Sequence, residues 1–167
     1  MKSIETEIKL IIEKPDAALI CAMPDYTESE ILQIYIASPD ATHRVRRRAY
    51  SDGRVEYTEN KKRRISKMSS VEEEREIGKS EFELLARSIE SGASPVIKTR
   101  RTFSYGGRTV EIDSYPAWKN SCILEVELPS ESDIPKLPEC IRVLLDVTGD
   151  KKYSNHSMAH SFPEEII

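Results

Sequence analysis

The chain has 167 residues, a length that suits one domain, so residues 1–167 are expected to form a single unit. Its formal net charge is −4, from 25 basic and 29 acidic residues, which excludes the basic excess typical of general nucleic-acid binding. Hydrophobic residues make up 38% and charged residues 32% of the chain, a composition that fits a fold whose interior is partly polar.

Alternating apolar and polar residues, bounded by turn residues, predict about eight β-strands. The predicted strands span residues 2–12, 30–37, 42–50, 54–61, 71–78, 95–105, 108–115 and 121–128. Ser51-Asp52-Gly53 and Gly106-Gly107 are strong turn signals that join neighbouring strands into hairpins. Two hairpins and many short strands indicate an antiparallel sheet, and closing that sheet into a barrel would remove its unpaired edges.

Short helices are expected at three places, each preceded by a cap or a proline. The expected helices begin near Pro15, at a capping box formed by Ser80 and Glu83, and after Pro138, where Ile141, Leu144 and Leu145 lead to a stop near Gly149. The second helix is expected to end at Gly92. Residues 62–70 are basic and polar and predict a mobile connection.

Charged side chains recur two residues apart in six of the predicted strands. These segments are Glu5-Thr6-Glu7-Ile8-Lys9, Arg44-Val45-Arg46-Arg47-Arg48, Glu72-Glu73-Glu74-Arg75-Glu76, Lys98-Thr99-Arg100, Glu111-Ile112-Asp113 and Glu125-Val126-Glu127. A strand sends residues i and i+2 to the same face, so each segment has one charged face. A single pair of this kind is typical of a solvated strand face, but six segments of one design favour a shared charged cavity.

The two kinds of charge suit two kinds of ligand. Carboxylates are the ligands that Mg²⁺ and Mn²⁺ prefer, whereas Arg and Lys bind phosphate oxygens. A barrel with both facing inward would be a polar tunnel for a polyphosphate bound with metal ions. No Walker loop, nucleophile elbow or Cys–His spacing is found, so a water attacking phosphorus with the help of a metal is favoured over covalent catalysis. His156 and His160 are spaced i, i+4 and are interpreted as surface histidines.

Cysteine usage and hydropathy bear on the compartment. Cys21, Cys122 and Cys140 are far apart and have no zinc-type spacing, which favours free thiols in a reducing cytoplasm. No apolar run approaches the length of a membrane helix, and Glu5 and Glu7 interrupt any signal-peptide pattern. We expect a cytoplasmic protein with no membrane or nucleic-acid partner, either a monomer or a homodimer.

An ordered series of short motifs resembles the CYTH superfamily, also called triphosphate tunnel metalloenzymes. The opening strand Glu5-Thr6-Glu7-Ile8-Lys9 is similar to its ExExK signature. The other matching motifs follow in family order and are Gln33-Ile34-Tyr35-Ile36, Arg44-Val45-Arg46, Glu72-x-Glu74, Lys98-x-Arg100, Glu111-x-Asp113 and Glu125-x-Glu127. The segment from Thr148 to Asn155 resembles the close of the short bacterial members, among them inorganic triphosphatases, so the resemblance covers nearly the whole chain.

The resemblance implies an α+β fold, an eight-stranded antiparallel β-barrel that forms a polar tunnel with a few flanking helices. It implies Mg²⁺ or Mn²⁺ as cofactor, a small-molecule triphosphate as partner, and Glu5, Glu7, Lys9 and Glu127 as catalytic residues. The implied phosphate-binding residues are Lys9, Arg44, Arg46, Lys61, Lys98 and Arg100. The implied metal ligands are Glu5, Glu7, Glu72, Glu74, Asp113, Glu125 and Glu127.

Several alternatives remain open on the sequence alone. The family often has T-x-K after the R-x-R hairpin, but here Thr58 is followed by Glu59-Asn60-Lys61-Lys62, so either lysine could face the tunnel. Hydrolysis of inorganic tripolyphosphate is the preferred function. An adenylate cyclase, a thiamine triphosphatase with Trp118 and Tyr115 stacking on an organic ring, and a polyphosphate-binding module without turnover are the alternatives.

Overall fold

A computed structural model describes residues 2–167 of the chain. Its strands are β1 (Lys2–Glu13), β2 (Thr27–Ile36), β3 (Thr42–Tyr50), β4 (Val55–Arg64), β5 (Ser69–Glu76), β6 (Val96–Tyr105), β7 (Arg108–Ser114), β8 (Ser121–Glu127) and β9 (Val143–Asp146). Its helices are α1 (Ala17–Cys21), α2 (Lys79–Ala86), the short 3₁₀ turn η1 (Lys151–Tyr153) and α3 (Asn155–His160). None of these helices is long and apolar enough to cross a membrane.

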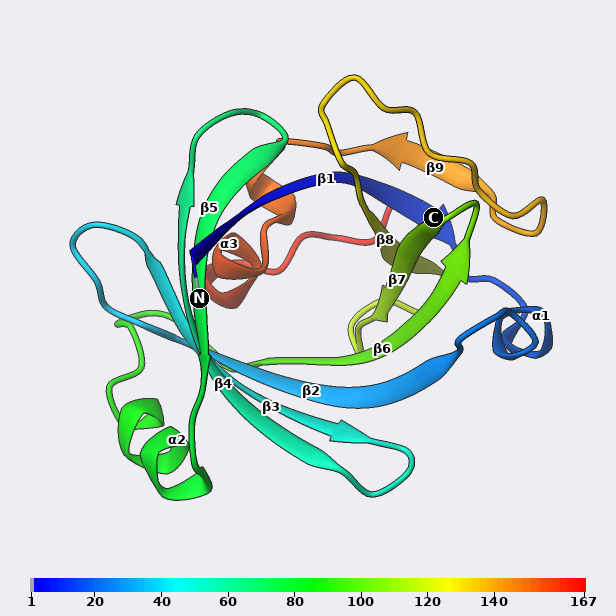
Figure 1. Cartoon of the computed structure of the whole chain (residues 1–167). Helices are drawn as coiled ribbons and strands as arrows, with labels where there is room; N and C mark the ends of the chain where they lie inside the picture. The colour runs from blue at the N-terminus through cyan, green and yellow to red at the C-terminus, as the bar shows by residue number, and fades with distance from the viewer. Residues whose placement is uncertain (1) are drawn as a thin grey trace.

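Eight of the strands close into an antiparallel barrel in the order β1-β8-β7-β6-β2-β3-β4-β5, and β5 pairs back to β1 (Figure 1). The remaining edge of β1 is divided along its length. Residues 2–6 pair with β5, whereas residues 10–12 pair with β9. The predicted α+β fold with an eight-stranded antiparallel barrel is confirmed, and β9 is a ninth strand that completes the hydrogen bonding of β1.

Strand parity separates a charged inner face from an apolar outer face. On β1, Glu5, Glu7 and Lys9 share one face, and the opposite face carries Leu10 and Ile12. Leu10 and Ile12 pack outside the barrel in a buried cluster with residues from β6, β7 and β8. A second cluster, Ile34, Ile36, Val45 and Phe82, joins β2 and β3 to α2. The apolar side chains are therefore buried on the outside of the barrel, and the inner face can carry polar side chains.

The inner face becomes apolar at one end of the barrel. Ile11 follows Lys9 on the inner side of β1, and Ile123 precedes Glu125 on the inner side of β8. Both are buried in a third cluster, which also contains Tyr153 and Met158 of η1 and α3. In Figure 1, which looks into the ring of strands, α3 lies within the outline of the ring near β5, and the chain after it runs across the opening. The C-terminal segment thus covers the apolar end of the interior.

Two segments differ from the sequence-based expectation. The helix expected through Ile141, Leu144 and Leu145 is wrong, because residues 143–146 form β9 and satisfy the edge of β1. The mobile connection expected at 62–70 is also wrong, because β4 runs to Arg64 and β5 begins at Ser69.

Helix ends also differ from the expectation. The N-cap of α2 is Gly78 rather than Ser80, and no side chain caps it. That helix ends at Ala86, before Gly92, and α3 was not anticipated in the polar tail.

Gly149 is held close to the β4–β5 connection and provides a test of this packing. It has φ +77, and a Cβ there would meet Lys67 Cγ at 2.3 Å and the Lys67 carbonyl oxygen at 3.0 Å. Gly107 has φ +73 but open space around it, so a substitution there measures the backbone strain without a steric clash. We expect Gly107→Ala to lower the free energy of unfolding by about 1 kcal/mol and Gly149→Ala by roughly 2–3 kcal/mol in denaturant titrations. Equal losses would show that the contact with Lys67 does not contribute.

Candidate active site in the barrel interior

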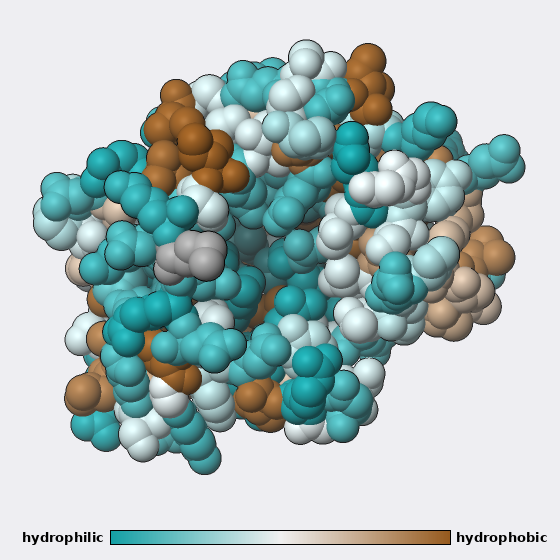
Figure 2. Space-filling view, in the orientation of Figure 1, coloured by the Kyte–Doolittle hydropathy of each residue, from teal (hydrophilic) through white to brown (hydrophobic). Residues whose placement is uncertain are grey.

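A cavity of about 500 Å³ occupies the interior of the barrel, and charged side chains from seven strands line it. They are Glu5, Glu7, Lys9, Arg44, Arg46, Arg48, Lys62, Arg64, Glu72, Glu74, Arg100, Glu111, Glu125 and Glu127. Figure 2 shows the same interior as a hollow surrounded by hydrophilic residues. The alternating charged segments from separate strands therefore converge on one enclosed space.

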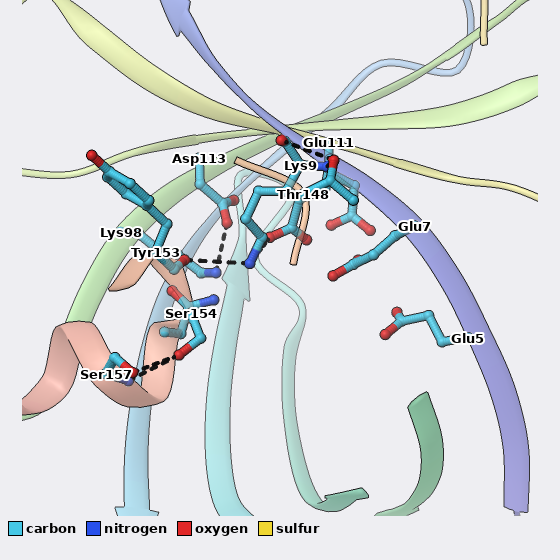
Figure 3. Close-up of polar contacts among 12 residues, drawn as sticks. Glu5, Glu7, Lys9, Lys98, Glu111, Asp113, Thr148, Tyr153, Ser154 and Ser157 are labelled. Carbon is cyan, nitrogen blue, oxygen red and sulfur yellow. Dashed lines mark hydrogen bonds and ion pairs between the residues drawn. The ribbon is translucent and has the colours of Figure 1, made fainter. Parts of the chain in front are cut away.

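One side of the cavity is acidic and centres on Lys62. Its Nζ lies 2.6 Å from Oε2 of Glu5, 3.2 Å from Oε1 of Glu72 and 4.0 Å from Oε1 of Glu7. Glu5 and Glu7 project from β1 into the same space (Figure 3). Glu127 lines this cavity and stands opposite Glu7 in the β1–β8 pairing. One ammonium group is thus shared among several carboxylates.

The pKa values on this side reflect crowded negative charge. Burial and the charge of Glu125 raise the pKa of Glu7 to about 8. Burial and the charge of Glu5 also raise the pKa values of Glu72 and Glu127. Glu5 shows the opposite direction: burial alone would raise its pKa, but the charge of Lys62 and the hydrogen bonds from Lys62 and Glu72 together lower it. Crowded carboxylates with too little compensating charge have the chemistry of a site for a hard divalent cation. Glu5, Glu7 and Glu72, which are half-buried, and Glu127, which is exposed, therefore fit Mg²⁺ or Mn²⁺.

The other side of the cavity is basic. Arg44 and Arg46 of β3 reach Glu74 only at 3.6 and 3.7 Å, and Nε of Arg44 is buried without a hydrogen-bond partner among the described residues. Burial and the charge of Arg44 lower the pKa of Arg46 to about 10, so this side chain remains a cation near neutral pH. Crowded guanidinium groups with unused donors are suited to an anion with many oxygens.

Glu125 connects the two sides. Its Oε1 lies 3.2 Å from Lys9 Nζ and its Oε2 lies 3.7 Å from Arg100 Nη2. The charges of Lys9 and Arg100 overcome the effect of burial and lower the pKa of Glu125 to about 2. Arg100 also pairs with Glu111. Glu125 is therefore ionised and already shared by two cations, unlike Glu7 and Glu127.

Lys98 and Asp113 lie behind the cavity wall and do not line it. Lys98 Nζ is 2.6 Å from Asp113 Oδ2, and Arg100 donates to both oxygens of Asp113, at 2.7 and 2.8 Å. Both side chains are almost completely buried. Direct contact of Lys98 with phosphate and of Asp113 with metal, as the resemblance implies, does not fit this placement. The pair instead fixes the guanidinium of Arg100, which does line the cavity.

Strand parity on β4 decides between the two candidate lysines. The β4–β5 register is regular from Thr58 to Arg64, so Thr58, Asn60 and Lys62 share the inner face. Lys61, which the resemblance implied as a phosphate-binding residue, is instead exposed on the outer face and does not line the cavity, so the inward-facing lysine is Lys62. Asn60 stands where the T-x-K pattern has lysine, and its amide donates to Glu74 Oε2 at 3.2 Å.

The C-terminal segment supplies lining residues that the sequence reasoning missed. Ser154, Asn155, His156 and Ser157 of the η1–α3 region all border the cavity. Lys9 is tied to the same segment, because its Nζ donates to the Tyr153 carbonyl at 3.4 Å (Figure 3). The family-like ending from Thr148 to Asn155 was the signal in the sequence, but no role was attached to it.

Trp118 and Tyr115 are not available for stacking on a ligand. Their rings pack edge to face with centroids 5.8 Å apart, and Trp118 Nε1 donates to the Pro163 carbonyl at 3.0 Å. Both belong to the apolar cluster at the covered end of the barrel and neither lines the cavity. The stacking role considered for them is therefore wrong.

Solved structures with the same fold include proteins from several sources. The inorganic triphosphatase NE1496 matches with 27% identity and a TM-score of 0.55, over 95% of this chain and 96% of that one. PH1012 from Pyrococcus horikoshii OT3 matches with 17% identity and a TM-score of 0.56, over 77% of this chain and 80% of that one, and shows the fold alone. A scan against protein-family models found no match, and neither did a search of curated proteins. The predicted resemblance to the CYTH superfamily is confirmed by the NE1496 match and the eight-stranded barrel.

The raised pKa of Glu7 predicts how metal-free stability depends on pH. Because the folded-state pKa of about 8 exceeds the ordinary value of 4.5, the carboxyl of Glu7 supports folding fully below pH 4.5 and loses this support as the pH rises to 8. Glu7→Gln keeps the shape without the titration. Without divalent metal, we expect the stability of the original chain to fall relative to Glu7→Gln across this window, by at most about 1.4 kcal/mol per pH unit. A constant difference from pH 4.5 to 8 in denaturant titrations would contradict the crowding of carboxylates around Glu7.

Proposed function

We propose that this chain is a divalent-metal-dependent triphosphatase that hydrolyses a phosphoanhydride bond, with inorganic tripolyphosphate as its preferred substrate. The observation that carries the proposal is the division of one enclosed cavity into an acidic side around Lys62 and a basic side around Arg44 and Arg46. The similarity to NE1496, an inorganic triphosphatase, supports it.

The basic side provides the contacts for the phosphate chain. A triphosphate carries several negative charges, which Arg44, Arg46 and Arg100 meet with planar donor groups and Lys9 meets with a point charge. Nε of Arg44 has no hydrogen-bond partner within residues 2–167 and would donate to a phosphate oxygen. These groups also lie where negative charge on a departing diphosphate would need stabilisation.

The acidic side provides the residues that would hold Mg²⁺ or Mn²⁺, namely Glu5, Glu7 and Glu127 with Glu72 beside them. A divalent cation there would screen the phosphate oxygens and lower the pKa of a water molecule. The chain's own contribution is to orient that water and to accept its proton. Burial and the charge of Glu5 raise the pKa of Glu72 in spite of the nearby Lys62, so its carboxylate is a better proton acceptor than an exposed one.

The lining of the cavity favours an inorganic substrate over a nucleotide or thiamine derivative. Among the described residues, Tyr35, Met68 and Val147 are the large apolar side chains that line it, and Trp118 and Tyr115 are packed elsewhere. A heterocyclic base is normally held by apolar and aromatic surface. A cavity bordered mainly by charged groups instead suits an anion without an organic ring.

The substrate assignment is tested by comparing tripolyphosphate, ATP and thiamine triphosphate, each with Mg²⁺ and with Mn²⁺. Release of phosphate, diphosphate and cyclic AMP is measured for each pair. We expect the highest kcat/KM with tripolyphosphate, no turnover after chelation of metal, and no cyclic AMP. Cyclic AMP formation from ATP, or faster turnover of thiamine triphosphate, would overturn the assignment.

Removal of one metal-binding carboxylate tests the acidic side. Glu5→Gln keeps the size of the side chain but removes its charge, so we expect turnover of tripolyphosphate to fall by about 100-fold or more. Glu73→Gln is the matched control, because Glu73 is exposed on the outer face of β5 beside Glu72. Circular dichroism checks that both variants fold. Unchanged turnover in a folded Glu5→Gln variant would remove Glu5 from the mechanism.

Two adjacent lysines on β4 provide a second matched comparison. Lys62→Ala leaves Glu5, Glu7 and Glu72 without their shared cation and removes a charge from the cavity, so kcat/KM should fall roughly tenfold or more. Lys61→Ala changes an exposed side chain and should stay within about twofold of the original chain. The reverse order of effects would mean that β4 has the opposite register.

A further inference from the structure

Three metal-ligand side chains meet beside the cavity, and only one of them, His156, borders it. Glu90, which lies between α2 and β6, has Oε2 2.8 Å from His156 Nε2 and Oε1 3.2 Å from His160 Nε2. One ligand atom from each of the three residues lies within 4.8 Å of the others. Both histidines are on α3, one helical turn apart, so their rings leave the same face of that helix.

The backbone around this cluster is held by independent contacts. The amide of Glu90 donates to the Tyr35 carbonyl at 2.8 Å, and the amide of Ser94 donates to the Ala159 carbonyl at 2.8 Å. The ring of Tyr35 packs against the ring of His156 with centroids 5.1 Å apart. These contacts join α3 to the Glu90 segment, so the three ligand groups are positioned by the fold and not by their mutual attraction alone.

The charge and exposure of the cluster suit a cation that arrives from solvent. Within residues 2–167, no Lys or Arg forms an ion pair with Glu90, and its two partners are imidazoles. The side chains are 28%, 37% and 33% exposed for Glu90, His156 and His160, so an ion has access without unfolding.

We propose that Glu90, His156 and His160 form a binding site for a zinc-type divalent cation. Two imidazole nitrogens and one carboxylate oxygen are the ligand set that Zn²⁺ accepts, with water in the fourth position. Small side-chain rotations bring the three ligand atoms to the roughly 3.3 Å mutual spacing of tetrahedral coordination. Mg²⁺ disfavours imidazole, so this site and the carboxylate site of the cavity select different metals.

Occupancy of this site has a structural consequence. The ion cross-links α3 to the segment between α2 and β6, and α3 is the helix that covers the apolar end of the barrel. A ligand that binds only the folded chain raises its melting temperature. The proposal does not depend on the triphosphatase reaction, because Glu90 and His160 do not line the cavity, and His156, which borders it, is assigned no contact with phosphate or with the cavity metal.

Zinc titration of the full chain, free of any affinity tag and in excess Mg²⁺, tests the proposal. We expect one Zn²⁺ per chain by isothermal titration calorimetry, and an affinity at least about tenfold weaker in His160→Ala. His43→Ala is the matched control, because His43 pairs with Glu59 at 2.7 Å without a second histidine. Cys21→Ser controls for the exposed thiol. Both controls should bind zinc as the original chain does.

A thermal readout keeps the test independent of catalysis. Saturating Zn²⁺ should raise the melting temperature of the original chain by about 5 °C or more, and this rise should disappear in His160→Ala and Glu90→Gln. His160→Ala should retain turnover of tripolyphosphate with Mg²⁺, so loss of zinc binding is separated from loss of function. Absence of stoichiometric zinc binding in the original chain, or zinc binding unchanged in both variants, would overturn the proposal and leave the cluster as an ion-paired group only.

Discussion

Charge neutralisation inside the barrel is the constraint on which the rest of the structure depends. A buried charge is tolerated only when an opposite charge or a bound ligand compensates for it. Lys62 compensates for Glu5 and Glu72, and Arg100 compensates for Asp113, Glu111 and Glu125. What these pairs leave over is concentrated in two places, the carboxylates near Glu7 and the arginines of β3. These uncompensated charges are costly to bury, and they make the interior receptive to an anion together with a cation.

The barrel separates these two requirements by position along its strands. The inner side of β1 runs from Glu5 and Glu7 through Lys9 to buried Ile11, and β8 runs from Glu127 and Glu125 to buried Ile123. The charged part of the interior is therefore backed by an apolar end, over which η1 and α3 pack. Lys98 and Asp113 occupy the boundary, where they hold Arg100 in place without reaching the cavity.

The sequence predicted what depends on local periodicity. Alternation on β1 placed Glu5, Glu7 and Lys9 on one face, and the two hairpin turns placed β3–β4 and β6–β7. Periodicity could not predict how far along the barrel axis an inward-facing side chain lies. Lys98 has the same strand parity as Arg100, yet only Arg100 lines the cavity. The position of each residue along the barrel axis determines whether its side chain reaches the cavity. Lys61 and Lys62 could be separated only once the β4–β5 register was known.

Long-range pairing accounts for the other differences. Residues 143–146 have a helical apolar pattern, but they form β9 because the edge of β1 beyond residue 6 would otherwise be unpaired. His156 and His160 read as surface histidines in the sequence, since nothing nearby along the chain shows that Glu90 faces them. Both cases concern partners separated by more than sixty residues, which a local pattern cannot reveal.

We propose that the two oppositely charged sides of the cavity bind one triphosphate together with a divalent cation. Anomalous diffraction from crystals grown with Mn²⁺ and a non-hydrolysable tripolyphosphate analogue tests it most directly. We expect a manganese peak among Glu5, Glu7 and Glu127, with phosphate density against Arg44, Arg46 and Arg100. Manganese and phosphate bound only outside the barrel, with the charged interior unchanged, would contradict it.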